Sequence, residues 1–171
     1  MREDIHVRLI IILVSVAVLS IIGFIFIKQH VLRVVLGTLA VSCLLLVCLF
    51  GIFIYDTIYK INPVDVSSSP DGAYELSFQQ VGQPDWPFGY THARLVLQKG
   101  KETVITKSLD IADDGCNASA NNWNVKWKGD SVEVSIYGDE QFDVLYTLNF
   151  DGTDERKQLD THYGETDDEF W

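Results

Sequence analysis

The chain has 171 residues and a formal net charge of −11, and this charge is distributed very unevenly. Residues 1–55 contain four Lys or Arg and two Asp or Glu, whereas residues 56–171 contain nine Lys or Arg and 22 Asp or Glu. Because so acidic a surface repels phosphate backbones, the composition argues against nucleic acid as a partner. The three cysteines are too few to form a disulfide framework.

Two uncharged apolar runs follow a polar N-terminal tail, residues 1–8. The first run, residues 9–27, would reach about 28 Å as a helix, close to the hydrocarbon thickness of a bilayer. The second run, residues 34–55, would reach about 33 Å and span with some tilt. The basic loop between them, residues 28–33, is short. We therefore predict an antiparallel hairpin of two transmembrane helices, with the lipid bilayer as a partner.

Two alternative interpretations of the apolar runs are a cleaved signal peptide and a lipoprotein signal. Arg2 and Arg8 give the first run a basic start, but the run is long and lacks a small-x-small cleavage site before Lys28. The sequence at residues 40–43 resembles a lipoprotein cleavage site, but Cys43 does not end the apolar run. The hairpin is therefore the preferred interpretation.

The distribution of basic residues predicts the orientation of the hairpin. Lys28 and Arg33 lie in the short loop without an acidic residue, whereas Arg2 and Arg8 share the N-terminal tail with two acids. The positive-inside rule then places the loop in the cytoplasm and the soluble domain outside the cell membrane. Neither run contains a charged residue, so the hairpin lacks the usual marker of ion transport.

Small residues in the second run predict where the two helices make contact. Thr38 and Ser42 are four positions apart and therefore share a helix face, with Gly37 adjacent to them. We expect this face to pack on the first helix, because small residues let two membrane helices approach closely.

A predicted linker, residues 56–69, connects the hairpin to the soluble part of the chain. Its Asn62-Pro63 pair breaks any continued helix. The stretch Ser69-Pro70-Asp71-Gly72 is a strong turn signal, because proline presets φ and glycine accepts a positive φ. The folded domain is therefore expected to begin at this turn and to cover residues 70–151.

Alternation of apolar and polar residues predicts the strands of this domain. Tyr74, Leu76 and Phe78 share one face of the first strand. Residues 94–98 and 103–109 give two more strands, joined around a Lys-Gly-Lys turn.

The best-determined register lies at a predicted two-residue hairpin turn, Gly129-Asp130. This turn places three apolar pairs on one face: Trp127 with Val132, Val125 with Val134, and Trp123 with Ile136. On the other face it places Lys126 opposite Glu133, a favourable cross-strand pair of opposite charges. One assumed turn thus satisfies both faces, which strongly supports the register.

A three-residue loop at residues 138–140 is predicted next, and it would pair Ile136 with Phe142 and Val134 with Val144. The domain is therefore expected to be small, all-β and mainly antiparallel, with about six strands. Three architectures agree with this prediction: a single twisted sheet, a small sandwich and a partly open barrel. Residues 152–171 are acidic and lack periodicity, which predicts a mobile tail.

The loop of residues 82–90 contains the candidate partner-binding residues Trp86, Phe88 and Tyr90. Two prolines preclude regular structure in this loop, and exposed aromatic side chains contribute much of the energy at protein interfaces. The alternative is that the three aromatic side chains fold back and cover one end of the sheet.

No metal, cofactor or catalytic site is predicted. Asp110, Asp113 and Asp114 lack the spacing and the final glutamate of a calcium-binding loop. His92 and His162 are the only histidines of the soluble part, and neither has a zinc-like spacing to a cysteine. Because no nucleophile can be combined with a base and an orienting acid, we do not expect an enzyme.

Three stretches of the chain resemble uncharacterised membrane-anchored proteins of Gram-positive bacteria: Ser69-Pro70-Asp71-Gly72-Ala73-Tyr74, Trp86-Pro87-Phe88-Gly89 and Asp113-Asp114-Gly115. Proteins of that family have one or two N-terminal spans and a small extracytoplasmic β-domain of unknown function. The resemblance covers residues 70–152 and implies an outward-facing domain. It implies no activity, cofactor or catalytic residue.

These features together predict a non-enzymatic cell-envelope protein. A membrane hairpin would display a small acidic β-domain that binds a protein, a peptide or a component of the cell wall. The alternative is a small regulatory subunit that acts on another membrane protein through the hairpin.

Overall fold

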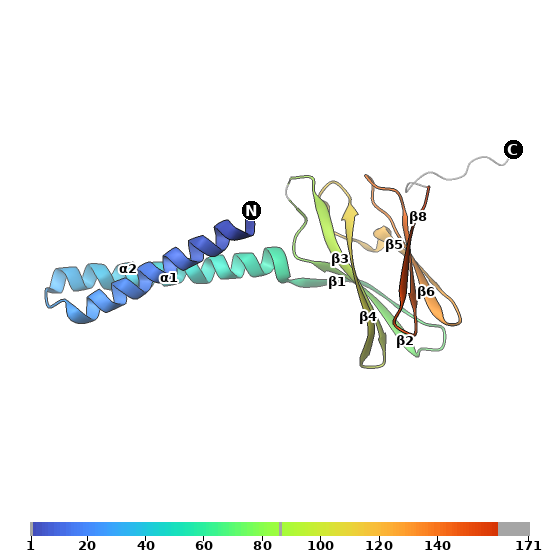
Figure 1. Cartoon of the computed structure of the whole chain (residues 1–171), viewed down its shortest axis with the longest axis horizontal. Helices are drawn as coiled ribbons and strands as arrows, with labels where there is room; N and C mark the ends of the chain where they lie inside the picture. Colours follow the sequence, from blue (N-terminus) through green and yellow to red (C-terminus); the bar gives the residue numbers. More distant parts are fainter. Residues whose placement is uncertain (1, 86, 161–171) are drawn as a thin grey trace. The chain divides into compact units, whose positions relative to one another are not determined.

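The computed structural model describes residues 2–85 and 87–160, with the side chains described from Val7 onward. The chain divides into two compact units, Met1–Asp56 and Thr57–Trp171, and each is described by itself. The first unit is a pair of helices and the second is a domain of strands (Figure 1).

The first unit contains helices α1 (Arg2–Phe26) and α2 (His30–Ile54). Both are long and apolar enough to cross a membrane, a property that they share with signal sequences. The predicted polar tail at residues 2–8 is part of α1, and only residues 27–29 separate the helices. The hydrogen-bonded turns of a helix therefore extend beyond the apolar runs that predicted it.

The contact between α1 and α2 is made of small residues. Ala17 and Ser20 on α1 and Ala40 and Cys43 on α2 are buried. The prediction that Thr38 and Ser42 would line this contact is wrong, because both are exposed and the Thr38 hydroxyl donates to the Val34 carbonyl, 3.0 Å away. The buried face is one position away on the helix, at residues spaced by three.

Glycines let the two helices approach each other near the connection. A Cβ on Gly37 would lie 3.3 Å from the Phe24 ring, and one on Gly23 would lie 2.9 Å from a Leu36 methyl carbon. The guanidinium of Arg33 lies 5.7 Å from the centre of the Phe24 ring, and its Nε donates to the Ile27 carbonyl. These contacts close the hairpin with a cation–π interaction and a helix-end hydrogen bond.

The segment predicted as a linker, residues 56–69, is instead largely regular structure. It contains most of a π-helical turn, Tyr55–Tyr59, followed by strand β1 (Ile61–Ser68). The prediction failed at Pro63, which lies at a β-bulge, where the register shifts before Asp65. A proline is tolerated there because β1 is an edge strand of its sheet.

The second unit contains two antiparallel sheets of four strands each, in the orders β1-β2-β3-β4 and β5-β6-β7-β8 (Figure 1). The remaining strands of the first sheet are β2 (Tyr74–Val81), β3 (Tyr90–Lys99) and β4 (Glu102–Ala112). The second sheet comprises β5 (Trp123–Trp127), β6 (Ser131–Ile136), β7 (Val144–Asn149) and β8 (Asp154–Gln158). The antiparallel β-class is confirmed, with eight strands in two sheets.

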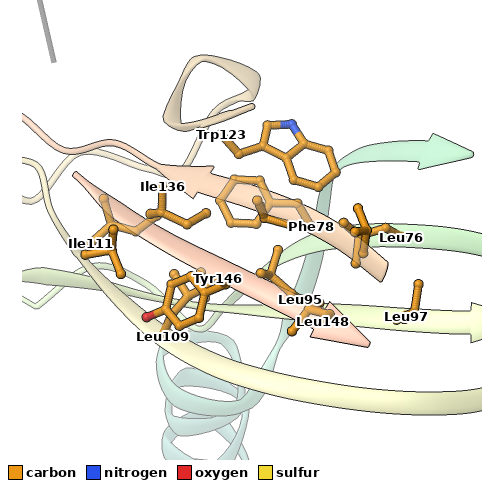
Figure 2. Packing of buried hydrophobic residues seen from close by; sticks show 14 residues of the cluster. Leu76, Phe78, Leu95, Leu97, Leu109, Ile111, Trp123, Ile136, Tyr146 and Leu148 are labelled. Atoms are coloured by element: carbon orange, nitrogen blue, oxygen red, sulfur yellow. The ribbon is translucent and has the colours of Figure 1, made fainter. Parts of the chain in front are cut away.

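The two sheets share one hydrophobic core, so the architecture is the sandwich among the three predicted alternatives. Figure 2 shows Phe78 beside Trp123, and their ring centres are 5.3 Å apart. The predicted alternation in β2 is confirmed at Leu76 and Phe78, which are fully buried. The core residues are Leu76, Phe78, Ala93, Leu95, Leu97, Leu109, Ile111, Trp123, Val132, Val134, Ile136, Val144, Tyr146 and Leu148.

The predicted register of β5 and β6 is confirmed at every position, including Lys126 opposite Glu133. The Glu133 carboxylate forms its ion pair with Lys128, at 3.2 Å, and Lys128 lies on the same face two positions away. The predicted pairing of β6 with β7 is wrong by two residues, because Ile136 pairs with Val144 rather than with Phe142.

The longer β6–β7 loop is explained by its contacts with the other sheet. The Glu140 N–H donates to the Ala112 carbonyl at 3.1 Å, and the Ala112 N–H donates to Gln141 Oε1 at 3.0 Å. Gly138 packs so closely that a Cβ there would lie 2.5 Å from the Ala112 oxygen. The sequence pattern of one hairpin carries no information about contacts with a strand so far away along the chain.

The edges of the two sheets are joined by side chains. On one side, the Trp123 indole donates to Asp65 and the Trp127 indole donates to Ser67, both at 3.0 Å. These bonds place β5 against β1. On the other side, Lys107 of β4 forms an ion pair with Asp154 of β8.

Part of the predicted C-terminal tail is a strand. β8 pairs with β7 from Asp154 opposite Leu148 to Gln158 opposite Val144. Four of its five residues are charged, as is common at sheet edges, so it lacks the alternation that would have predicted it. Residues 161–171 lie outside the described part of the chain.

Candidate functional site

The two ends of the sandwich carry connections of very different length. The four connections at one end span residues 69–73, 100–101, 128–130 and 150–153. The three at the other end span residues 82–89, 113–122 and 137–143, and the chain also enters the domain there, at Lys60. We call these the tight-turn end and the long-loop end. In Figure 1 the tight turns lie low in the domain and the long loops lie high.

The connection of residues 113–122, named the crossing loop, has to traverse the whole long-loop end. It leaves β4 on one edge of the sandwich and enters β5 on the opposite edge. Thr91 of β3 donates its hydroxyl hydrogen to the Cys116 carbonyl. Gln80 of β2 then accepts from the Ala118 N–H and donates to the Asn117 side chain, both at 2.9 Å. The loop is thus attached to successive strands as it crosses them.

Thr91 and Gln80 are buried polar residues whose side chains form hydrogen bonds with the crossing loop. Sequence reasoning missed both, because their partners are 25 and 38 residues away along the chain. The only available signal was a polar side chain at the end of an apolar strand. Such a residue requires a hydrogen-bonding partner once it is buried.

A second set of hydrogen bonds ties the crossing loop to the β6–β7 loop. Asn122 Nδ2 donates to Asp113 Oδ2 at 3.0 Å and to the Tyr137 carbonyl at 3.2 Å. The Ser119 side chain and backbone N–H both donate to Asn122 Oδ1, and Ser119 caps the short turn that precedes β5. The two loops therefore form one continuous surface.

The loop of residues 82–90, named the aromatic loop for its predicted binding residues, is closed by its own backbone hydrogen bonds. The Asp85 N–H donates to the Tyr90 carbonyl, and the Gly89 N–H donates to the Asp85 carbonyl, both at 2.9 Å. Any side chain on Gly89 would collide with Asp85. Phe88 is 77% exposed and Tyr90 is 55% exposed, so these two side chains do not cover the core. Trp86, the third predicted residue, lies outside the described part.

Backbone strain is concentrated at this end. Phe88 (φ 57°) and Asp114 (φ 49°) are the two non-glycine residues with positive φ in the described part of the chain. This conformation costs about 1–2 kcal/mol for a residue with a Cβ. The two positions adjoin each other, since a Cβ on Gly115 would lie 3.4 Å from the Phe88 backbone.

His92 connects the aromatic loop to the first sheet. Its Nδ1 lies 2.7 Å from Asp110 of β4, and its Nε2 lies 3.4 Å from Asp85 in the aromatic loop. About half of each side chain is exposed, so the contribution of this arrangement to stability is small.

Acidic side chains crowd together beside the aromatic loop. The hydrogen bond between Glu140 and Asp114 raises the pKa of Glu140 above its ordinary value, and the negative charges of Asp114, Asp113 and Asp139 raise it further. A hollow of about 190 Å³ adjoins this cluster; its lining includes Asp113, Asp139 and Tyr137. Groups of this kind attract a cationic side chain.

Within the part of the chain that the structure describes, no three His, Cys, Asp or Glu residues are placed to hold a metal ion. Asp110, one of the three predicted acids, contacts His92, whereas Asp113 contacts Asn122. Cys116 is exposed on the crossing loop as a free thiol.

Comparisons with protein-family models, with curated proteins and with solved structures give no match for this chain.

Proposed function

We propose that this protein is a two-pass membrane protein whose β-sandwich binds a basic segment of a protein partner at the long-loop end. The two apolar helices are the membrane anchor, and the sandwich lies outside the cell membrane. Phe88 and Tyr90 supply the apolar contact, and the acidic cluster supplies the charge. The sandwich thus acts as a binding module.

The observation that carries this proposal is the strained and exposed position of Phe88. Its backbone is in the left-handed region and its side chain is 77% exposed, so neither conformation nor burial stabilises it in the unbound protein. Backbone strain of this kind is concentrated at functional sites, where the surrounding structure holds it. The closed turn holds Phe88 in this way, and its backbone lies where a Cβ on Gly115 would touch it.

The charge of the partner follows from the crowded carboxylates. Asp114 and Glu140 repel each other when both are ionised, which is why the pKa of Glu140 is raised. A lysine or arginine side chain placed between them would relieve this repulsion. The neighbouring hollow, lined in part by Asp113 and Asp139, is large enough for one such side chain.

The test uses the full chain in lipid nanodiscs and a panel of fluorescent peptides. Basic peptides with aromatic residues are expected to bind, whereas versions with Lys and Arg changed to Glu are not. Phe88→Ala should weaken binding about tenfold, as truncation of an interface aromatic commonly does. Val66→Ala is the matched control, because Val66 is a half-exposed apolar residue on β1.

Equal affinity for basic and acidic peptides, or unchanged affinity in Phe88→Ala, would contradict the proposal. The folded state of each variant is checked by the fluorescence of Trp123 and Trp127, which lie in the sandwich core and at its margin.

The orientation has its own test at Cys116. This thiol is exposed, whereas Cys43 and Cys48 lie within the apolar helix α2. A membrane-impermeant maleimide added to intact cells should label Cys116 if the sandwich is extracytoplasmic. Labelling only after lysis would place the sandwich in the cytoplasm instead.

A second candidate function is regulation of another membrane protein through the hairpin. It is favoured by Thr38 and Ser42, which face away from the contact between α1 and α2. Replacing both helices with an unrelated transmembrane hairpin separates the candidates. Retained peptide binding and cellular function support the binding module, whereas loss of cellular function with binding retained supports the regulatory subunit.

A further inference from the structure

The helical segment that contains α2 ends inside the second unit. This segment, His30–Tyr59, runs through the π-helical turn without a break, and the second unit begins at Thr57. The Gln83 N–H donates to the Thr57 carbonyl and the Gly82 N–H donates to the Lys60 carbonyl, both at 2.8 Å. We call these two hydrogen bonds the helix-end contact. The last carbonyl groups of a helix lack partners within it, and the helix-end contact supplies one to Thr57.

The helix-end contact requires glycine at position 82. Gly82 has a φ of +70°, and a Cβ there would lie 2.3 Å from the Thr57 oxygen and 3.0 Å from the Ile58 oxygen. Any other residue would therefore have to push the helical turn away. The close approach of this turn to the base of the aromatic loop depends on a single glycine.

The helix-end contact leads directly into the long-loop end. Gln83 is two residues before Asp85, whose N–H and carbonyl close the turn around Phe88. The Gly82 carbonyl also accepts a hydrogen bond from the buried Gln80 side chain at 3.0 Å, and Gln80 holds the crossing loop. A displacement of the helical turn therefore reaches the aromatic loop and the crossing loop through a continuous set of hydrogen bonds.

The length of the second helix indicates what would displace this turn. Its uncharged part, residues 34–55, reaches about 33 Å, against about 28 Å for residues 9–27 of the first helix. Because the hydrocarbon layer of a bilayer is about 30 Å thick, the second helix has to tilt, and its tilt depends on the thickness of the layer. The helix continues without a break to Tyr59, so a change in tilt acts on the helix-end contact.

We propose that the thickness of the bilayer regulates binding at the long-loop end and that the helix-end contact transmits the change. This inference rests on the proposed membrane anchor and binding site. A change in the tilt of α2 moves the turn at Thr57, which shifts Gln83 and the loop that holds Phe88. The coupling is reciprocal, so a bound peptide also biases the tilt of α2.

The first experiment uses the full chain and needs no peptide. The protein is placed in nanodiscs of a thin bilayer, dilauroylphosphatidylcholine, or a thick one, dierucoylphosphatidylcholine, and its backbone amide signals are followed by NMR. The signals of Gly82, Gln83 and Gly89 should shift between the two bilayers, whereas those of Gly100 and Gly152 at the tight-turn end should not. Identical Gln83 and Gly89 signals in both bilayers would overturn the inference.

The second experiment measures the affinity of a basic peptide in the same two nanodiscs. The affinity should differ about fivefold or more between them, the usual lower range of coupling between two sites. Equal affinity in both bilayers would overturn the regulation and leave the binding function standing. Shifted amide signals without any peptide binding would instead contradict the proposed function and support the transmission, so the two failures are distinguishable.

Gly82→Ala and Gly72→Ala form a matched pair of variants for the first experiment. The two glycines have φ values of +70° and +69°, but only the methyl group at position 82 would meet the helical turn. Gly82→Ala should abolish the thickness-dependent shift of the Gly89 signal, and Gly72→Ala should retain it. Equal behaviour of the two variants would contradict the role of the helix-end contact.

A second variant keeps the test decisive if Gly82→Ala does not fold. A Gly-Gly insertion after Ile54 interrupts the helix before Thr57 and leaves both residues of the β2–β3 loop that donate to the helix end unchanged. Its Gln83 and Gly89 signals should no longer depend on bilayer thickness. A dependence that persists in this variant would overturn the inference.

Discussion

At both ends of the sandwich the chain reverses direction between antiparallel strands, but the two ends do this with different backbone conformations. At the tight-turn end, every residue with positive φ is a glycine: Gly72, Gly100 and Gly152. At the long-loop end, Phe88 and Asp114 adopt positive φ despite their side chains. Glycine removes the strain of this conformation, whereas Phe and Asp retain it.

The carboxylates of the two ends differ in the same sense. At the tight-turn end, Asp71 accepts a hydrogen bond from the Ser69 hydroxyl, and Asp151 accepts from the Thr153 hydroxyl, both at 2.6 Å. Those bonds lower the pKa of each aspartate below its ordinary value. At the long-loop end, the contact with Asp114 raises the pKa of Glu140. One end thus stabilises its charges, and the other holds charges that repel.

This difference shows that the tight-turn end is arranged for stability and that the long-loop end is not. The rule that glycine occupies positive φ is obeyed throughout the tight-turn end, whereas at the long-loop end Gly82 and Gly115 obey it and Phe88 and Asp114 break it. Natural proteins break such rules mainly at functional sites, which is the basis for placing the binding site at the long-loop end.

Among the variants that test the difference between the two ends, a replacement of Gln80 is expected to have the largest effect on stability. Replacement by leucine removes the partner of the part-buried Ala118 N–H and releases the crossing loop, so the free energy of unfolding should fall by about 2–3 kcal/mol. Urea unfolding followed by tryptophan fluorescence measures this loss. A loss below about 0.5 kcal/mol would show that the crossing loop is not held by Gln80.

Gly72→Ala probes the tight-turn end. Its φ is +69° and no atom lies within 4 Å of the added methyl group, so conformation alone should lower stability by about 1 kcal/mol. Gly129→Ala is the matched control, because it also has open space and does not have a positive φ. Equal effects in the two variants would mean that positive φ is not what Gly72 provides.

How far the sequence predicts these features depends on where the interacting partner lies. The β5–β6 register follows from one turn and two alternating faces, so local sequence was sufficient. β1 and β8 were missed because a proline and a run of charges removed the alternation from edge strands. Gln80 could not be assigned a role, because its partners are distant along the chain.

The candidate site was predictable in part. Phe88 and Tyr90 could be named because aromatic residues around proline and glycine are unusual in a loop. Their exposure could not be predicted, since it depends on the turn between Asp85 and Tyr90. The hollow of about 420 Å³ between β1 and the crossing loop had no sequence signal, because its lining residues are distant along the chain.

Phe88→Gly should make the long-loop end resemble the tight-turn end, because glycine would then occupy this positive-φ position. Glycine relieves the left-handed strain, so stability should rise by up to about 1 kcal/mol, reduced by the greater freedom of the unfolded chain. Peptide binding should be lost at the same time. A stability gain together with unchanged binding would separate the strain from the function and contradict the proposed role of Phe88.

The smallest expected effect is a difference in pH dependence between the ends. The pKa of Asp151 is lower in the folded state, so its stabilising contribution is present above the ordinary Asp value and is lost as pH falls through the folded pKa. The pKa of Glu140 is raised, so the folded state keeps this proton longer and loses stability as pH rises from the ordinary Glu value through the raised pKa. Asp151→Asn should therefore reduce the loss of stability in acid.

Glu140→Gln should instead reduce the loss of stability as pH rises toward neutrality, because the repulsion between Glu140 and Asp114 is removed. Melting temperatures measured across both pH ranges separate the two variants, and the two profiles should change in opposite directions. Adding a basic peptide that binds should act on the unaltered protein as Glu140→Gln does, since both remove the same repulsion. If the peptide instead changes the melting temperature only in the acidic pH range, the bound cation lies away from Glu140. The acidic cluster is then not the binding surface.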